Sequence, residues 1–70
     1  MRVSFKRIFE PTGPTTVRTL TRVAIGGEVL APGTILDKGG AIGGTPLKEL
    51  WERDLEVMRA GTTTRIVGAY

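Results

Sequence analysis

Apolar and polar residues alternate with a period of two through much of the first half of the chain. Val3 and Phe5 alternate with polar neighbours in residues 2–9, and valines and threonines alternate through residues 15–25. This period places successive side chains on opposite faces of a β-strand, and β-branched residues are favoured on a pleated sheet. The pattern therefore predicts strands over residues 2–9 and 15–25.

Glycine and proline pairs divide the next part of the chain into shorter pieces. Gly26-Gly27 lies between two apolar runs, as in a two-residue hairpin turn. Pro32-Gly33 suits the centre of a type II turn, because proline fixes φ and glycine accepts a positive φ. We expect short strands next to these turns and a last strand near the end of the chain, at residues 28–31, 34–36 and 62–67.

Residues 45–60 change to a helical period. Their apolar side chains recur at spacings of 3, 1, 4 and 3 in one stripe, namely Leu47, Leu50, Trp51, Leu55 and Met58. Thr45 and Pro46 are typical of a helix N-terminus, and Gly61 is typical of the residue that follows a helix. The spacing predicts one amphipathic α-helix over residues 45–60 that packs on the sheet through this stripe.

The combined pattern predicts the α+β class in one small domain, residues 1–70. We expect a small, curled, mainly antiparallel sheet of four to five short strands with the single helix against it. Residues 1–14 end in a loop rich in proline and glycine and are compatible with an extended arm. Four glycines make residues 38–44 a glycine-rich loop, either flexible or closely packed. Because so small a sheet is marginally stable alone, we expect association to stabilise it.

The chain of 70 residues contains neither cysteine nor histidine. Disulfides, thiolate or imidazole metal ligands and histidine-based acid–base catalysis are therefore excluded. The glycine-rich loop is followed by Thr45-Pro46 and lacks the lysine of a P-loop. The acidic residues of the predicted helix are expected to form a solvated face. We expect no enzyme, no metal site and no cofactor.

Basic residues are concentrated near the start of the chain. The net charge is +3, and residues 1–25 hold five basic residues against one acidic residue. Arginine suits carboxylates and phosphates, and an apolar chain end suits strand addition to a partner. We therefore predict that a partner is contacted by Arg2, Lys6, Arg7, Arg18, Arg22, Ile66, Val67 and Tyr70.

No apolar run of the sequence reaches the length that a membrane span needs. The basic start is not followed by the apolar run of a secretory signal. We expect no membrane contact, and a location in the cytoplasm or in a particle assembled there.

Residues 23–67 contain a strand, a glycine turn, a Pro-Gly turn, an aliphatic pair with aspartate, an acidic predicted helix and a closing glycine. These parts are Ile25-Gly26-Gly27-Glu28-Val29-Leu30, Ala31-Pro32-Gly33, Thr34-Ile35-Leu36-Asp37, residues 49–58 and Gly61. This order resembles small structural proteins encoded in bacteriophage head and head–tail modules. The resemblance implies a non-enzymatic virion component, such as a capsid cement, adaptor or minor capsid protein, and it implies no catalytic residue.

Two functions stay open at this stage. The first is a structural protein of a virion that binds a larger, repeated partner, such as a capsid or head–tail protein, by surface burial and strand pairing. A homo-oligomer is also compatible with the apolar chain end. The second is a small basic module that binds nucleic acid or acts as a regulator. No aromatic side chain stands beside Arg18 and Arg22 to stack on bases, so nucleic acid is the less favoured partner.

Overall fold

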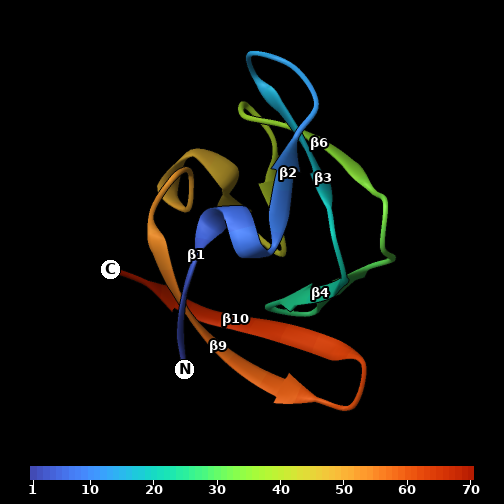
Figure 1. Ribbon diagram of the computed structural model, residues 1–70, viewed down its shortest axis with the longest axis vertical. Coiled ribbons are helices and arrows are strands. Elements are labelled where there is room, and N and C mark those ends of the chain that lie inside the picture. The colour runs from blue at the N-terminus through green and yellow to red at the C-terminus, as the bar shows by residue number, and fades with distance from the viewer.

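The computed structural model describes residues 1–70 and is mostly β (Figure 1). Its only helical elements are two 3₁₀ turns of three residues each, η1 and η2. The elements follow one another in the order β1 (Arg2–Ser4), η1 (Phe5–Arg7), β2 (Phe9–Pro11), β3 (Thr16–Thr19), β4 (Arg22–Ile25), β5 (Glu28–Leu30), β6 (Ile35–Asp37), β7 (Ala41–Ile42), β8 (Thr45–Pro46), η2 (Leu47–Glu49), β9 (Asp54–Ala60) and β10 (Thr63–Ala69). The α+β class predicted from the sequence is therefore wrong.

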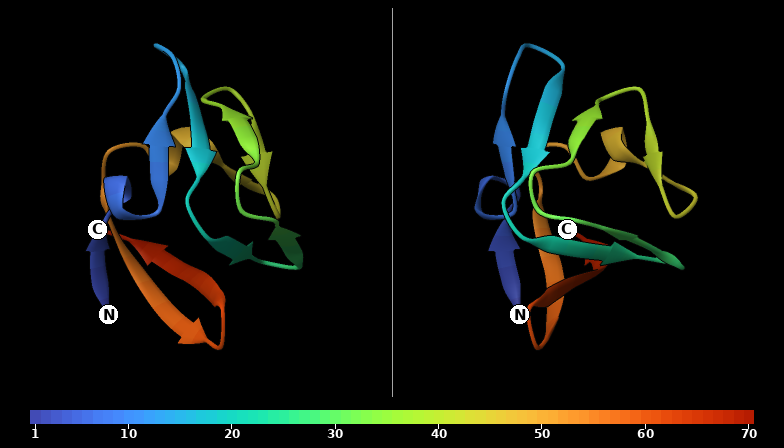
Figure 2. Two further views of the ribbon diagram at one scale, coloured as in Figure 1. Left: turned by 45° about the vertical axis from the view of Figure 1, so that its right-hand side comes forward. Right: turned by 90° about the vertical axis from the view of Figure 1, so that its right-hand side faces the viewer.

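The strands form three separate sheets. Five strands make the largest sheet in the order β1-β9-β10-β4-β5, where all neighbours are antiparallel except the parallel pair β10 and β4. An antiparallel sheet has the order β2-β3-β6, and β7 pairs with β8. Figure 2 shows the long β9–β10 hairpin at one end of the molecule and β2 and β3 at the other. The two larger sheets together enclose the core.

The core is a cluster of 12 buried apolar residues drawn from all three sheets and both 3₁₀ turns. Phe9 of β2, Val17 of β3 and Leu55 of β9 have no exposed surface. The ring of Phe5 stacks on Phe9 with a centroid distance of 4.6 Å, and Trp51 lies 5.3 Å from Phe5. Burying each large apolar side chain contributes about 1.5–3 kcal/mol. The first residues of the chain thus fold into the core and do not extend as an arm.

Residues 45–60, predicted as one amphipathic helix, form β8, η2, a turn and β9 instead. Leu50 and Leu55 reach the core as expected, but Met58 is 61 % exposed. Val57, which the helical stripe omits, is buried together with Leu55. Burial in this segment therefore follows the period of two of a strand, not the helical period.

The backbone at Glu52 leaves the helical path. Its φ is 58°, a left-handed conformation that residues other than glycine seldom adopt. The N–H of Leu50 donates to the carbonyl oxygen of Leu47 at 2.9 Å, which closes η2 as a single turn. Beyond this turn the chain pairs with β10 and β1 over the length of β9. Strand pairing with β10 in a hairpin and with the distant β1 thus overrides a local pattern that suits either period.

The predicted strand over residues 15–25 is two strands that belong to different sheets. β3 ends at Thr19 in the three-stranded sheet, and β4 begins at Arg22 in the five-stranded sheet. The predicted strand over residues 2–9 is likewise interrupted by η1. Alternate residues are nevertheless buried on both sides of the break between β3 and β4, namely Val17, Thr19, Val23 and Ile25. The period of two therefore identified the buried face but not the change of sheet.

The predicted hairpin at Gly26-Gly27 is present, and its turn packs against the glycine-rich segment 38–44. A Cβ atom on Gly26 would lie 2.9 Å from the carbonyl oxygen of Gly43, and both glycines have positive φ angles of 57° and 55°. The N–H of Gly43 donates to Oε1 of Glu28 at 2.7 Å. The segment 38–44 thus contains the strand β7, and its Gly43 is packed against the hairpin turn.

Candidate protein-interaction surface

The five-stranded sheet has one face on the core and one face in solvent. Its inner face carries alternate side chains that are buried, namely Val23, Ile25, Leu55, Val57, Thr64 and Ile66. The residues between them lie on the opposite side, which we call the outer face. The register of the strands therefore decides which side chains are neighbours there.

One row of the outer face crosses four neighbouring strands. Arg65 of β10 lies opposite Met58 of β9 and Ala24 of β4, and Ala24 lies opposite Val29 of β5. Met58 and Val29 are 61 % and 56 % exposed, whereas the small Ala24 between them is buried. Neighbouring strands are about 4.8 Å apart, so these side chains form one continuous strip. The strip places a guanidinium group between exposed apolar side chains.

A second arginine lies in the next row of the outer face. Arg22 is opposite Thr63, which is itself opposite Ala60. Arg22 takes part in none of the three ion pairs of the molecule. Arg65 has only a long contact of 3.4 Å from Nη1 to the carbonyl oxygen of Gly26. Both guanidinium groups are therefore available to an anionic group outside the chain.

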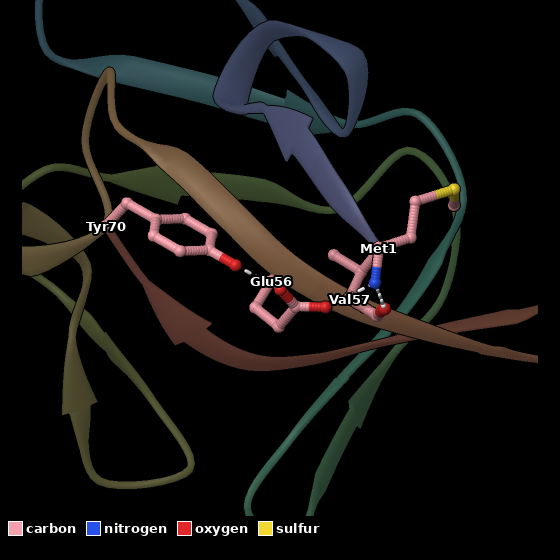
Figure 3. A network of polar contacts seen from close by, with 4 residues as sticks. All are labelled: Met1, Glu56, Val57 and Tyr70. Carbon is pink, nitrogen blue, oxygen red and sulfur yellow. Dashed lines mark hydrogen bonds and ion pairs between the residues drawn. The ribbon is translucent and has the colours of Figure 1, made fainter.

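Arg2 and Tyr70, two of the residues predicted to contact a partner, are held by contacts within the chain, and Figure 3 shows the contact of Tyr70 with Glu56. Nε of Arg2 donates to Oδ2 of Asp54 at 2.9 Å, and its guanidinium lies 4.1 Å from the centre of the Tyr70 ring. Glu56 of β9 accepts hydrogen bonds from the Tyr70 hydroxyl and from the amine of Met1. These contacts join β1, β9 and β10 at one edge of the sheet.

The same contacts shift two pKa values. The amine of Met1 and, second, the hydroxyl of Tyr70 hold the pKa of Glu56 below its ordinary value. The hydrogen bond to Glu56 raises the pKa of Tyr70 above its ordinary value. Both shifts favour the ionised carboxylate together with the neutral phenol, the pair that forms the hydrogen bond. The cluster therefore acts as a structural tie at neutral pH.

The remaining predicted contact residues are spread over the molecule. Arg18 forms an ion pair with Glu10 across β3 and β2, which offsets its charge. Lys6 and Arg7 lie on η1 and take part in no ion pair. Ile66 is buried on the inner face at 5 % exposure. The five basic residues of the predicted patch thus do not form one surface, and only Arg22 of them lies beside a free arginine on the outer face.

Val67, the remaining predicted contact, is 51 % exposed. It lies where the register of β10 against β9 shifts between Ile66 and Gly68. This irregularity places Val67 outside the regular alternation of β10. Its side chain is thus available to a partner, whereas that of Ile66 is not.

Arg65, Met58 and Val29 were missed by sequence reasoning. Met58 was assigned to the buried stripe of the predicted helix, and Arg65 lies outside the basic start of the chain. A period-two reading of residues 54–69 would have placed Met58 and Arg65 away from the buried Leu55 and Ile66. Only the register shows that β4 and β5 bring Arg22 and Val29 beside them.

The structure contains no group of three or more histidine, cysteine, aspartate or glutamate side chains placed to hold a metal ion. It also contains no helix long and apolar enough to cross a membrane. Comparison of the chain with protein-family models, with curated proteins and with solved structures gives no match.

Proposed function

We propose that this protein is a non-enzymatic structural component that binds a larger, repeated protein partner through the outer face of its five-stranded sheet. The observation that carries the proposal is the strip of Met58, Arg65 and Val29, with Arg22 beside it, exposed and without intramolecular ion pairs. A virion protein such as a capsid or head–tail protein is the partner that the resemblance of residues 23–67 suggests. Capsid cement, adaptor and minor capsid protein are the roles that such binding would serve.

The chemistry of the outer face favours a protein over a nucleic acid. Methionine and arginine are enriched in protein–protein interfaces, where apolar side chains are buried and guanidinium groups meet carboxylates. The strip has no aromatic side chain on which a base could stack, and its free arginine, Arg65, lies between Met58 and Ala24. A partner with acidic side chains around an apolar centre would match this arrangement.

Affinity purification tests the proposal with the double variant Arg22→Glu/Met58→Asp. The wild-type chain, immobilised in extracts of the organism that encodes it, should retain one protein in fixed stoichiometry. The double variant should lose that protein, because it reverses one charge and places a carboxylate in the apolar strip. The control Lys6→Glu/Leu20→Asp changes a basic and a 46 % exposed apolar residue elsewhere, and it should retain the partner.

Anisotropy measurements with labelled single-stranded DNA, duplex DNA and RNA complete the test. We expect no saturable binding at low salt. Binding that weakens steeply as salt rises, and that the double variant abolishes, would instead assign the outer face to nucleic acid. Equal retention of the protein partner by wild type and double variant would also overturn the proposal.

A further inference from the structure

The parallel pairing of β10 with β4 covers only the first half of β10. The paired residues are Thr63, Thr64 and Arg65 with Arg22, Val23 and Ala24. Beyond Arg65, β10 continues to Ala69 beside β9. On its other side β4 ends at Ile25, and the backbone turns away at Gly26. The second half of β10 therefore has a strand on one side only.

The register shows which backbone groups this free edge presents. The N–H of Tyr70 donates to the carbonyl oxygen of Asp54 at 2.9 Å, and Ala69 is opposite Leu55. Because antiparallel strands alternate hydrogen-bonded and non-hydrogen-bonded pairs, the N–H and C=O of Ala69 point away from β9. The N–H and C=O of Leu55 likewise point away from β10, and on that side Leu55 is paired with Val3 of β1. Ala69, which is exposed, has no corresponding strand.

An open groove runs along this free edge. Its first part, of about 360 Å³, has the apolar Ile25, Leu50 and Ile66 among its lining residues and Arg65 at its side. Its second part, of about 470 Å³, shares Leu50 and Gly68 with the first and reaches Ala69 and Arg53. The free edge comprises the four residues Ile66 to Ala69, about 13 Å at the strand rise of about 3.3 Å per residue. We call this groove the strand slot.

The charges along the strand slot favour an acidic occupant. Arg65 and Arg53, in its first and second parts, take part in no ion pair, and the single acidic lining residue is Glu49. A strand in the slot would place alternate side chains over the apolar lining and toward solvent near the arginines. The occupant that fits is an extended segment with apolar residues alternating with carboxylates.

We propose that the strand slot binds an extended acidic segment of a partner protein by strand addition to the free edge of β10. The segment continues the line of β4, exchanges backbone hydrogen bonds with Ala69 and places carboxylates near Arg65 and Arg53. This binding goes beyond the proposed function, because the slot runs along the free edge of β10, whereas the strip lies on the outer face of the sheet. Only Arg65 borders both surfaces.

Titration with synthetic peptides tests the strand slot by amide NMR. The probe is a capped hexapeptide that alternates aspartate and valine, and the comparison peptide alternates lysine and valine. The acidic peptide should shift the amide signals of Val67, Gly68 and Ala69 and slow hydrogen exchange at Ala69. The lysine peptide should leave these signals unchanged.

Two variants locate the interaction. Arg53→Glu should weaken binding of the acidic peptide at least about tenfold, whereas Lys48→Glu, the same charge change outside the lining, should bind as wild type does. Ala69→Pro removes the amide that the segment would use and should abolish binding; its folding is checked from the retained signals of β9 and β4. Arg53→Glu, which leaves the strip unchanged, should in turn retain the protein partner that the double variant Arg22→Glu/Met58→Asp loses, which separates this test from that of the proposed function.

Several outcomes would contradict the proposal that the strand slot binds an acidic segment by strand addition. Equal binding of the two peptides would show that charge is not recognised there. Unchanged exchange at Ala69 during binding, or no signal change at millimolar peptide, would show that no strand is added. Slowed exchange at Ala69 that depends on protein concentration without peptide would assign the free edge to a second copy of the chain.

Discussion

Two buried threonines of this protein differ in whether their hydroxyl groups have partners. Oγ1 of Thr19 donates to the carbonyl oxygen of Ala31 at 2.9 Å and accepts from the N–H of Thr34 at 3.0 Å. Oγ1 of Thr64, on the inner face of β10, has no hydrogen-bond partner. Both residues are 1 % exposed. The first hydroxyl therefore holds the turn between β5 and β6, while burial of the second costs free energy.

Replacing each threonine by valine should have opposite effects. Thr64→Val removes an unsatisfied hydroxyl at nearly constant volume and should raise the free energy of unfolding by about 1 kcal/mol. Thr19→Val leaves the N–H of Thr34 without its partner and should lower the free energy of unfolding by about 1–3 kcal/mol. Urea denaturation of the two variants measures both changes. A destabilised Thr64→Val variant would indicate that this hydroxyl has a partner in solution.

At the scale of elements, the edge of the largest sheet depends on contacts of β9 with the two ends of the chain. β1 is only three residues long, and the backbone of Met1 accepts from the N–H of Val57 at 2.8 Å. Glu56 of β9 then connects the start of the chain to Tyr70 beyond β10 (Figure 3). A strand this short adds few backbone hydrogen bonds, so the side-chain contacts help to fix it in place.

The stability that the contacts of Glu56 with Met1 and Tyr70 contribute should depend on pH in both the acidic and the alkaline range. The pKa of Glu56 is lowered by folding, so its contribution to stability is present above about pH 4.5 and is lost as pH falls through the lowered pKa. The pKa of Tyr70 is raised, so its contribution is present below about pH 10 and is lost as pH rises through the raised pKa. Glu56→Gln should therefore differ most from wild type in unfolding free energy between these limits.

Urea denaturation across the pH range measures this difference, with Glu49→Gln, at an exposed residue outside any ion pair, as the control. An absorbance titration of the phenol should show a lower pKa of Tyr70 in Glu56→Gln than in wild type. An unfolding free energy difference that is independent of pH would contradict the tie.

Residues 45–60 show how far an element can be predicted from its sequence. The residues Leu47, Leu50 and Leu55 are spaced for a helix, but Leu55 and Val57 are also spaced for a strand. The sequence correctly indicated that Leu47, Leu50 and Leu55 are buried. It did not indicate their secondary structure, because this depends on the pairing of β9 with β10 in a hairpin and with β1 at a separation of 50 to 54 residues.

At the scale of the whole molecule, two glycine turns from separate sheets pack against each other. The turn after β4 belongs to the five-stranded sheet, and the turn between β7 and β8 belongs to the smallest sheet. They meet at Gly26 and Gly43, where a Cβ atom on Gly43 would overlap the carbonyl oxygen of Ile25. The neighbouring Gly44 has a positive φ of 83°, but a Cβ atom there would meet nothing within 4 Å.

Alanine substitution at these two adjacent glycines should distinguish the free-energy cost of the close contact from the cost of backbone strain. Gly44→Ala incurs only the left-handed strain of about 1–2 kcal/mol. Gly43→Ala incurs the same strain and also displaces the two turns, so it should destabilise the protein by at least about 1 kcal/mol more. Thermal or urea unfolding of both variants measures the difference. Equal destabilisation would mean that the turns separate without cost.

The interaction surface was predictable only in part. The contacts predicted from the sequence include Arg22 and Val67, whose side chains are exposed, but not Arg65. The prediction grouped Arg22 with Arg2 and Arg18, yet those two form ion pairs with Asp54 and Glu10. Which arginines stay free depends on strand register, and register depends on pairing between distant segments.

The sequence by itself determined which residues of the segment 15–25 are buried and that the chain turns at Gly26-Gly27 and at Gly33. The period of two in residues 15–25, the pair Gly26-Gly27 and the turn at Gly33 are local signals, because side-chain direction and φ are properties of a few adjacent residues. The tertiary structure alone decided that residues 54–60 are a strand, that two sheets share residues 15–25, and that one edge of β10 stays open. These outcomes rest on backbone hydrogen bonds between strands, some in the local β9–β10 hairpin and others between segments far apart in the chain, and the side-chain pattern does not show which strands pair.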